Sequence, residues 1–490
     1  MVNVITPAVD VEDDVFVPMS PMDAVMNTYR VVLLYIYPPP SRSAAAYSLD
    51  KLHRSFISLV DEDYPVLVGT LDADQKTGAV SVKQTPEARR RGGSGIRFER
   101  NSTSIQTTDN AIASLSWEFM PKTRSSGEII AVKGSILADG GMVIGVDCSH
   151  VLFDGEATLT FMKAWGQHYS GVNNQDRLVI NHERQLLSGN GEASRLPHPE
   201  FQIMPAEPLV RREDGSLAPK AATIPPKTAQ QVFHLSLETM AKLKHAAESA
   251  TSVEKAKRVS KRDGILATLQ SLLRSKHTKV VQDAPTSQPS YISTLDAITA
   301  LFTILITQAR GHGREVRVST AVNGRKRLEP PLPENYAGNA VFHAISSYTC
   351  KDLECDGDAR TVASTSTLSR VAHRIRSSIL QRDSKFMRDT IAFLSDQTGL
   401  SSINDNVNFF CGPDVAFTCW ATLGLYDAEF GGMRPRYASI PRVQCMDGFV
   451  LITDAARGKE GLDALVCLES ATMTKFRDLC ANVEYLHDQV

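Results

Sequence analysis

The segment DCSHVLFDG, from Asp147 to Gly155, combines a histidine, an aspartate and a glycine directly after an apolar run. His150 stands behind the sequence GMVIGV, Asp154 comes four positions later, and an apolar-periodic stretch follows Gly155. A neutral imidazole has the right pKa to take a proton from a hydroxyl near pH 7. We therefore consider His150 a candidate general base, with Asp154 turning back to fix its geometry and Gly155 allowing a sharp turn.

The spacing of this pair is weak support on its own, because a chain with 12 histidines can carry one such pair by chance. Rival chemistries have less support. The sequence contains no Gly-rich loop with a Lys–Ser/Thr pair, no G-x-S-x-G nucleophile elbow and no dinucleotide fingerprint. A Cys–His pair stays open, although no local signature marks a nucleophilic cysteine. The eight cysteines match no zinc-binding pattern, so we expect no metal site.

Length and composition exclude several classes of protein. The 490 residues are 42% hydrophobic and 22% charged, and they are too many for one compact core, so we expect two domains. A net charge of −2 gives no electrostatic case for nucleic acid as a partner. The N-terminal stretch lacks the features of a secretory signal, and no apolar run approaches the ~18 residues of a membrane helix. Together with scattered cysteines, this predicts a cytoplasmic protein.

Strands and helices alternate in the first half of the chain. An amphipathic helix carries Leu49, Leu52, Phe56 and Leu59 at helical spacing and should end before Pro65. Apolar and β-branched runs predict strands at 29–38, 66–73 and 78–84, two strands within 128–150 joined by the turn 138–141, and then a helix at 156–168.

Periodicity fades between residues 186 and 226, which are rich in Pro, Gly and Ser and read as a crossover between the domains. The second half resumes the alternation, so we expect an α/β layer structure in each half. Its predicted elements are strands at 230–237, 315–323, 414–420, 448–456 and 463–470, helices at 238–249 and 293–310, and a closing helix.

These pieces resemble the BAHD acyl-CoA-dependent acyltransferases over nearly the full length of the chain. The family's H-x-x-x-D-G motif stands at 150–155, and VPMSPMDAVMNTYRVVLLYIY is similar to its N-terminal segment. NGRKRLEPPLPENYAGN, from Asn323 to Asn339, is close to its Arg-x-Arg, Pro-Pro-Leu-Pro and Tyr-Phe-Gly-Asn run. TCW at 418–420 resembles its Thr-Ser-Trp, and YDAEFGGMRP at 426–435 resembles its Asp-Phe-Gly-Trp-Gly segment.

The chain departs from the family in the last of these segments. Glu429 stands where the family has Asp, Gly432 replaces its Trp, and Met433 replaces its second Gly. The stretch 251–289 is also longer than usual. Such divergence is similar to fungal members that act on secondary metabolites, of the trichothecene acetyltransferase type, and it argues against plant phenylpropanoid substrates.

The resemblance implies an α/β fold of two chloramphenicol-acetyltransferase-like domains with an active-site channel between them. We expect an N-terminal domain at 1–190, a crossover at 191–229 and a C-terminal domain at 230–490. Acyl-CoA would enter the channel from one face and the acceptor from the other. The resemblance implies acyl-CoA as a co-substrate and no bound cofactor, and we expect a monomer with no membrane partner.

The resemblance also assigns roles to individual residues. His150 is the general base, and Asp154 points away from the substrate to form a structural ion pair with Arg325. Thr418 donates to the oxyanion and Trp420 lines the acceptor pocket, although a strand threonine and a core tryptophan explain them as well. The resemblance further places a CoA contact at Ser293, which helix capping explains equally well, and CoA phosphates could meet Lys255, Lys257, Arg258, Lys261 and Arg262, which also suit a solvated loop.

The predicted function is transfer of an acyl group, acetyl by preference, from acyl-CoA to a hydroxyl of a small secondary metabolite, without an acyl-enzyme. A non-catalytic acyl-CoA or small-molecule binding protein on the same fold is the alternative that the altered EFGGM segment favours. Amide formation in the style of condensation domains is the third, although Ser149 replaces the first histidine of their motif.

Overall fold

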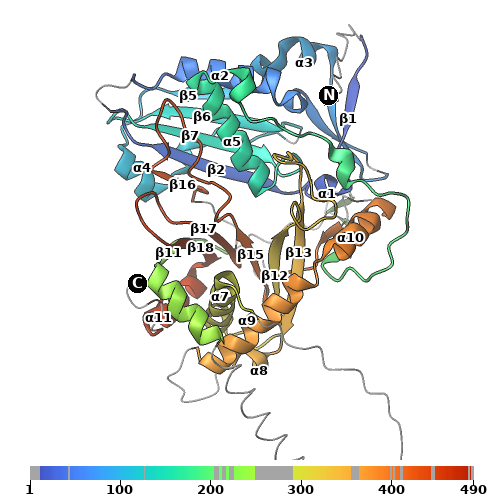
Figure 1. Ribbon diagram of the computed structural model, residues 1–490, viewed down its shortest axis with the longest axis vertical. Helices are drawn as coiled ribbons and strands as arrows, with labels where there is room; N and C mark the ends of the chain where they lie inside the picture. Colours follow the sequence, from blue (N-terminus) through green and yellow to red (C-terminus); the bar gives the residue numbers. More distant parts are fainter. Residues whose placement is uncertain are drawn as a thin grey trace, which may run out of the picture.

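The computed structural model shows two α/β lobes, each built on one large sheet, with the sheets facing one another (Figure 1). The α/β class and the two-lobed arrangement predicted from the sequence are confirmed. The structure describes residues 12–41, 45–74, 76–125, 127–203, 209–211, 217–219, 226–248, 291–354, 363–397, 400, 403–408, 412–442, 447–483 and 486.

The first sheet has five strands in the order β16-β2-β7-β6-β5. Its central pair is antiparallel, with Arg30 of β2 opposite Ser149 of β7. Strand β6 is antiparallel to β7 and parallel to β5. The four strands that come from the first half are β2 (Arg30–Tyr37), β5 (Phe98–Asn101), β6 (Ile130–Ile136) and β7 (Met142–Ser149).

Strand β2 is buried on both faces because each face meets a different partner. Val31, Leu33 and Tyr35 pack with the helices α2 (Leu49–Glu62) and α5 (Gly155–Ser170), which cover the outer face of the first sheet. The alternate residues Val32, Leu34 and Ile36 face the second sheet instead. A strand covered on both faces reads as one continuous apolar run, which is how RVVLLYIY appears in the sequence.

The fifth strand of the first sheet comes from the second half of the chain. Strand β16 (Tyr437–Ser439) pairs antiparallel with β2, so that Tyr437 lies opposite Ile36 and Ser439 opposite Leu34. Figure 1 shows this segment crossing from the second lobe to the first. The domain boundaries at residues 190 and 230 stay a prediction. The three residues of β16 come from the second half of the chain and complete the sheet of the first lobe.

The second sheet has six strands in the order β11-β18-β17-β15-β12-β13. Its helices α7 and α9 lie on the face turned away from the first lobe (Figure 1), and α7 is buried along nearly its whole length. The strands and helices are β11 (Thr228–Leu235), β12 (Val316–Asn323), β13 (Val341–Tyr348), β15 (Val415–Cys419), β17 (Phe449–Asp454), β18 (Leu462–Glu469), α7 (Thr294–Arg310), α9 (Thr365–Leu380) and α11 (Ser470–Ala481).

Smaller elements frame the two sheets. The strands predicted at 66–73 and 78–84 are present in shorter form as the antiparallel pair β3 and β4, and residues 237–248 are helical as expected. These elements are β1 (Val15–Pro18), β3 (Thr70–Ala73), β4 (Val80–Gln84), β8 (Phe201–Ile203), β9 (Leu209–Arg211), β10 (Leu217–Pro219), β14 (Ile403–Asp405), α1 (Pro21–Ala24), α3 (Pro86–Arg91), α4 (Thr108–Ser114), α8 (Cys350–Leu353) and α10 (Ser384–Asp396).

The predicted crossover lies partly outside the described residues. Within the described part, β8 belongs to neither large sheet and pairs antiparallel with β14 in a separate two-stranded sheet. Near it, His198 contacts Glu200 at 2.8 Å and Asp389 of α10 at 3.0 Å, so this stretch is attached to the second lobe. None of the helices in the described ranges combines the length and the apolar character that crossing a bilayer requires.

Candidate active site

His150 begins the turn that connects β7 to α5. Ser149 is the last residue of β7, and the backbone N–H of His150 donates to the carbonyl oxygen of Tyr29 at 3.1 Å. Asp154 caps the N-terminus of α5 by accepting from the backbone N–H of Ala157 at 2.9 Å. The motif thus places His150 directly after the buried strand β7, close to the capped N-terminus of α5.

Asn339 determines which ring nitrogen of His150 carries the proton. Its amide nitrogen lies 2.9 Å from Oδ1 of Asp23, 2.7 Å from the carbonyl of His150 and 3.0 Å from that of Val151, and all three atoms can only accept. Its oxygen must therefore be the atom 3.0 Å from Nδ1 of His150, and that oxygen can only accept. Nδ1 carries the proton, and Nε2 has its lone pair free.

Asp23 holds Asn339 in place across 316 positions of sequence. Its Oδ1 also accepts from the backbone N–H of Asn339 at 2.9 Å, and its Oδ2 accepts from the hydroxyl of Ser20 at 2.7 Å. Arg184 neutralises the carboxylate at 2.9 Å. All four side chains are buried, so the histidine is supported by a network that joins both halves of the chain.

Asp154 and Arg325 form a buried, two-pronged ion pair. Nη1 of Arg325 donates to Oδ2 at 2.7 Å and Nη2 donates to Oδ1 at 2.9 Å. Nη2 also donates to the carbonyls of Tyr336 and Gly338, which hold the loop that carries Asn339. The geometry agrees with the expected structural pair, and Asp154 contacts Arg325 rather than lining the cavity beside His150.

Burial and charge shift the pKa values of the two motif residues in ways that suit these roles. Burial lowers the pKa of His150 below its ordinary value of 6.5, and the negative charge of Asp154 offsets only part of this effect. Burial alone would raise the pKa of Asp154, but the guanidinium of Arg325 and hydrogen bonds hold it below its usual value. At neutral pH the site therefore contains an uncharged imidazole and an ionised carboxylate.

A cavity of about 220 Å³ between the two sheets brings three of the predicted residues together. His150 lines it from the first lobe, and Thr418 and Trp420 line it from β15 and the turn that follows. Among the described residues, neither Nε2 of His150 nor the hydroxyl of Thr418 has a hydrogen-bond partner. Most of the wall is apolar, and it includes Val32, Ala321, Val341, Val407, Ala416, Phe417, Ile440, Phe449 and Leu451.

Gly155 serves a different purpose from the one expected. It is the first residue of α5 and has no left-handed backbone, so it does not make a sharp turn. A methyl group on its Cα would lie 2.4 Å from Nε1 of Trp420. The glycine is therefore required because the indole of Trp420 packs directly on the helix start.

The structure places two further residues. His343, which belongs to no motif of the sequence, lies on β13 and lines the cavity with His150. Ser293 caps α7 reciprocally, with its hydroxyl accepting from Asp296 N at 3.2 Å and its N–H donating to the Asp296 carboxylate at 2.7 Å. Capping accounts for Ser293, which does not line the cavity, and Lys255, Lys257, Arg258, Lys261 and Arg262 lie outside the described residues.

The altered segment EFGGM lies apart from the cavity. Phe430 is buried against Tyr37, Trp165 and Tyr169, and it forms a two-way backbone bridge with Met433. Asp427 and Glu429 have a common exposed partner in Arg434, at 3.4 and 4.0 Å. The three departures at Glu429, Gly432 and Met433 therefore change a surface loop and not the wall around His150.

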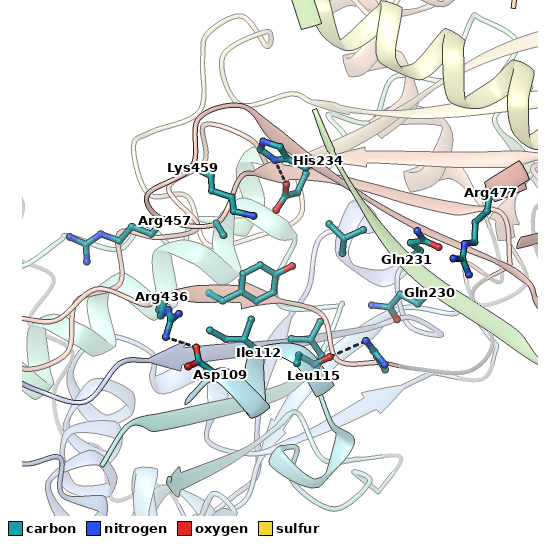
Figure 2. A pocket seen from close by; sticks show the side chains of 16 residues that line it. Asp109, Ile112, Leu115, Gln230, Gln231, His234, Arg436, Arg457, Lys459 and Arg477 are labelled. Atoms are coloured by element: carbon teal, nitrogen blue, oxygen red, sulfur yellow. Dashed lines mark hydrogen bonds and ion pairs between the residues drawn. The ribbon is translucent and has the colours of Figure 1, made fainter. Parts of the chain in front are cut away.

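Figure 2 shows a second cavity, of about 770 Å³, at the edge of the interface between the lobes. It lies among β11, β16, α4 and the turn from β17 to β18. Arg436 reaches Asp109 at 2.7 Å, and other cations on its wall are Arg442, Arg457, Lys459 and Arg477. Neither His150 nor any other predicted site residue lines it.

The cysteines nearest the site are poor nucleophiles. Burial raises the pKa of Cys148 to about 12 and that of Cys419 to about 11, so both thiols are protonated at neutral pH. Within the described ranges, no group of three His, Cys, Asp or Glu side chains has the arrangement of a metal site.

Comparison with solved structures identifies the class of fold. The F. graminearum TRI101 protein, solved in complex with coenzyme A and deoxynivalenol, superposes with a TM-score of 0.68 over 97% of this chain and 99% of its own, at 13% sequence identity. Vinorine synthase superposes with a TM-score of 0.61 at 17% identity, over 98% of this chain and 97% of its own. The chain therefore has the two-lobed fold of these proteins.

The family follows from the sequence itself. The model of the Transferase family matches residues 1–482, so the chain belongs to that family, the BAHD acyltransferases, as predicted. It is an enzyme of the acyl-CoA-dependent acyltransferase class, with acyl-CoA as co-substrate.

Three curated relatives of similar length are plant enzymes. A hydroxycinnamoyltransferase of Narcissus pseudonarcissus is 23% identical over 94% of both chains. A hydroxycinnamoyl-CoA:5-hydroxyanthranilate N-hydroxycinnamoyltransferase of Avena sativa is 24% identical over 95% of both. Putrescine hydroxycinnamoyltransferase 1 of Oryza sativa subsp. japonica is 23% identical over 94% of this chain and 93% of its own.

Proposed function

We propose that the protein transfers an acyl group directly from acyl-CoA to a nucleophile of a small acceptor, with His150 as general base. The observation that carries the proposal is the orientation of the imidazole. Asn339 fixes the proton on Nδ1, and the free Nε2 shares a cavity with the hydroxyl of Thr418. A neutral base and a hydrogen-bond donor beside one cavity are what acyl transfer to a hydroxyl or an amine requires.

The proposed reaction proceeds with both substrates bound together. Nε2 of His150 takes the proton from the acceptor hydroxyl while the hydroxyl oxygen attacks the carbonyl carbon of the thioester. The hydroxyl of Thr418 donates a hydrogen bond to the oxyanion that develops. The tetrahedral intermediate collapses, the C–S bond breaks, and the imidazolium returns the proton to the CoA thiolate. An amine acceptor would follow the same path, with nitrogen in place of oxygen.

The finer details of the substrates remain predictions. Transfer of acetyl to a hydroxyl of a secondary metabolite by a fungal enzyme is the interpretation that the departures in the sequence favour. The cytoplasmic location and the monomeric state also stay predictions. The plant relatives support hydroxycinnamoyl groups as rival donors, and two of their names support amide formation as a rival to ester formation. The alternative of a non-catalytic binding protein was favoured by the altered EFGGM segment. This segment does not line the cavity beside His150, so it no longer supports that alternative.

The proposal is tested by incubating the protein with acetyl-CoA and p-coumaroyl-CoA and a panel of alcohols and amines, with mass detection of the product. His150→Ala should lower kcat by roughly 10²–10⁴-fold and leave CoA binding unchanged, because only the base is lost. The matched control is His53→Ala, since His53 lies on α2 outside the cavity. Acyl transfer by His150→Ala at the rate of the control would exclude this mechanism.

A further inference from the structure

The cavity beside His150 contains polar groups that the proposed reaction does not use. They are Tyr29, Ser319, His343 and Asp405, in a wall that is otherwise largely aliphatic and aromatic. Arg30 lines the same cavity, but its guanidinium is already engaged by the carboxylate of Asp147. The two ionisable side chains that remain for a ligand are therefore His343 of β13 and Asp405 of β14, which face one another in this cavity.

Asp405 is a largely buried carboxylate to which no side chain in the described ranges donates a hydrogen bond. It ends β14, and its side chain is 15% exposed. The nearest group of opposite potential charge is Nε2 of His343 at 3.8 Å, which is too long for a hydrogen bond. No other described residue donates to its side chain. A carboxylate in an apolar cavity is costly unless donors surround it, so Asp405 suits a ligand that brings donors of its own.

His343 presents an unused ring nitrogen to the same space. Its Nδ1 lies 3.1 Å from the hydroxyl oxygen of Ser319, and its buried Nε2 has no hydrogen-bond partner in the part of the chain that the structure describes. When Nδ1 donates to Ser319, Nε2 is an acceptor. Asp405 and His343 then offer two acceptors 3.8 Å apart, and a single hydroxyl, with one hydrogen, cannot satisfy both.

We propose that Asp405 and His343 form an acceptor subsite for a cationic nitrogen group, an ammonium or a guanidinium, on the molecule whose nucleophile faces His150. Such a group brings several N–H donors and a positive charge, which matches both acceptors and neutralises the carboxylate. The largely apolar wall of the shared cavity suits the carbon chain that links cation and nucleophile. The assignment of the bound molecule as the acceptor rests on the proposed function.

The relatives agree with this class of acceptor. One carries putrescine in its name, a molecule with two amino groups, of which one can react while the other stays charged. The subsite is defined by residues of this chain, however, and it applies equally to an acceptor whose reacting group is a hydroxyl.

Calorimetric titration tests the subsite without requiring any reaction. The ligands are agmatine and putrescine, with butane-1,4-diol as the neutral molecule of the same length. The cations should bind the intact protein, and Asp405→Asn should weaken them by about 10–100-fold, the range for losing hydrogen bonds to a charged group. Binding of the diol should be weak and unchanged. Asp72→Asn is the matched control, because Asp72 is exposed on β3 and outside the cavity.

A second variant guards against a folding defect. His343→Phe keeps the ring and removes the acceptor, so it should weaken the cations by about 2–10-fold. The subsite is excluded if neither cation binds the intact protein, if Asp405→Asn binds them as tightly as Asp72→Asn, or if the diol binds as tightly as putrescine.

The His150→Ala variant separates this proposal from the proposed function. It should bind the cations as the intact protein does, because His150 is not part of the subsite. Binding through Asp405 without any acyl transfer would retain the subsite and reject the proposed reaction. Acyl transfer whose rate changes neither with Asp405→Asn nor with the charge of the acceptor would reject the subsite and retain the proposed reaction.

Discussion

The side-chain oxygen of Asn339 lies 3.0 Å from Nδ1 of His150, and three acceptors around the amide nitrogen leave no other orientation. This contact joins residues 189 positions apart in the sequence. It makes Asn339 a positioning residue, because it acts on the substrate only through the histidine.

Replacing Asn339 tests that role. Asn339→Ala should lower kcat by about 10²-fold, since a misplaced base loses its near-attack geometry. The contact with Asn339 also raises the pKa of His150, so its loss should move the acid limb of the pH profile to lower pH. Asn482→Ala, an exposed asparagine on α11's end, is the control. Equal loss of activity at every pH would indicate a structural role only.

The pH dependence of the intact enzyme follows from burial of His150. Its pKa lies below the ordinary 6.5, so the imidazole is a free base at pH 7, and kcat/KM should fall only as the pH drops below 6.5. The folded state binds this proton less readily than the unfolded chain does, so the stability contribution is present above pH 6.5 and is lost on acidification. An acid limb centred above 6.5, measured from pH 5 to 9, would contradict this assignment.

The pair of Asp154 and Arg325 should behave as a single unit in unfolding experiments. Removing either partner leaves an unpaired buried charge, and each alanine variant should lose about 3–5 kcal/mol of unfolding free energy. Activity should fall in both, because the pair anchors α5 to the loop of Asn339. In a double-mutant cycle the combined loss should be clearly smaller than the sum. Strict additivity would mean that the two side chains do not interact in solution.

Direct transfer predicts that no acylated protein accumulates. Incubation with acyl-CoA alone should leave the intact mass unchanged, because the thiols nearest the site are held protonated by burial, with the pKa of Cys419 raised to about 11. Cys419→Ser should keep most of the activity, and a chelator should have no effect. A stable acyl adduct, or complete inhibition by the chelator, would show that another group carries the chemistry.

The sequence alone predicts the candidate site residues that stand close together in one short motif. His150 and Asp154 are four positions apart, and the alternation of strands and helices around them predicted the α/β lobes. Asn339 stood in a recognised run but received no role, because its importance depends on contacts with residues far away in the chain. His343 belongs to no motif, and only the alternation of side chains along β13 places it on the same face as Val341.

Other features of the site could not be seen in the sequence for different physical reasons. Asp405 belongs to a three-residue strand that pairs outside both sheets, and no periodicity marks so short an element. The need for Gly155 comes from the indole of Trp420, which approaches from the other half of the chain. A glycine that accommodates a distant neighbour looks the same in a sequence as one that makes a turn.

Strand β16 has a consequence for how the protein can be divided and how it can open. Because Tyr437–Ser439 complete the sheet edge at β2, a fragment that stops near residue 229 would leave that edge bare, and its backbone groups would be free to recruit another chain. Co-expression of the two fragments should rescue solubility only when the second one retains this strand. The same pairing joins the two lobes through main-chain hydrogen bonds, so we expect that a wide opening of the cleft would require β16 to separate from β2.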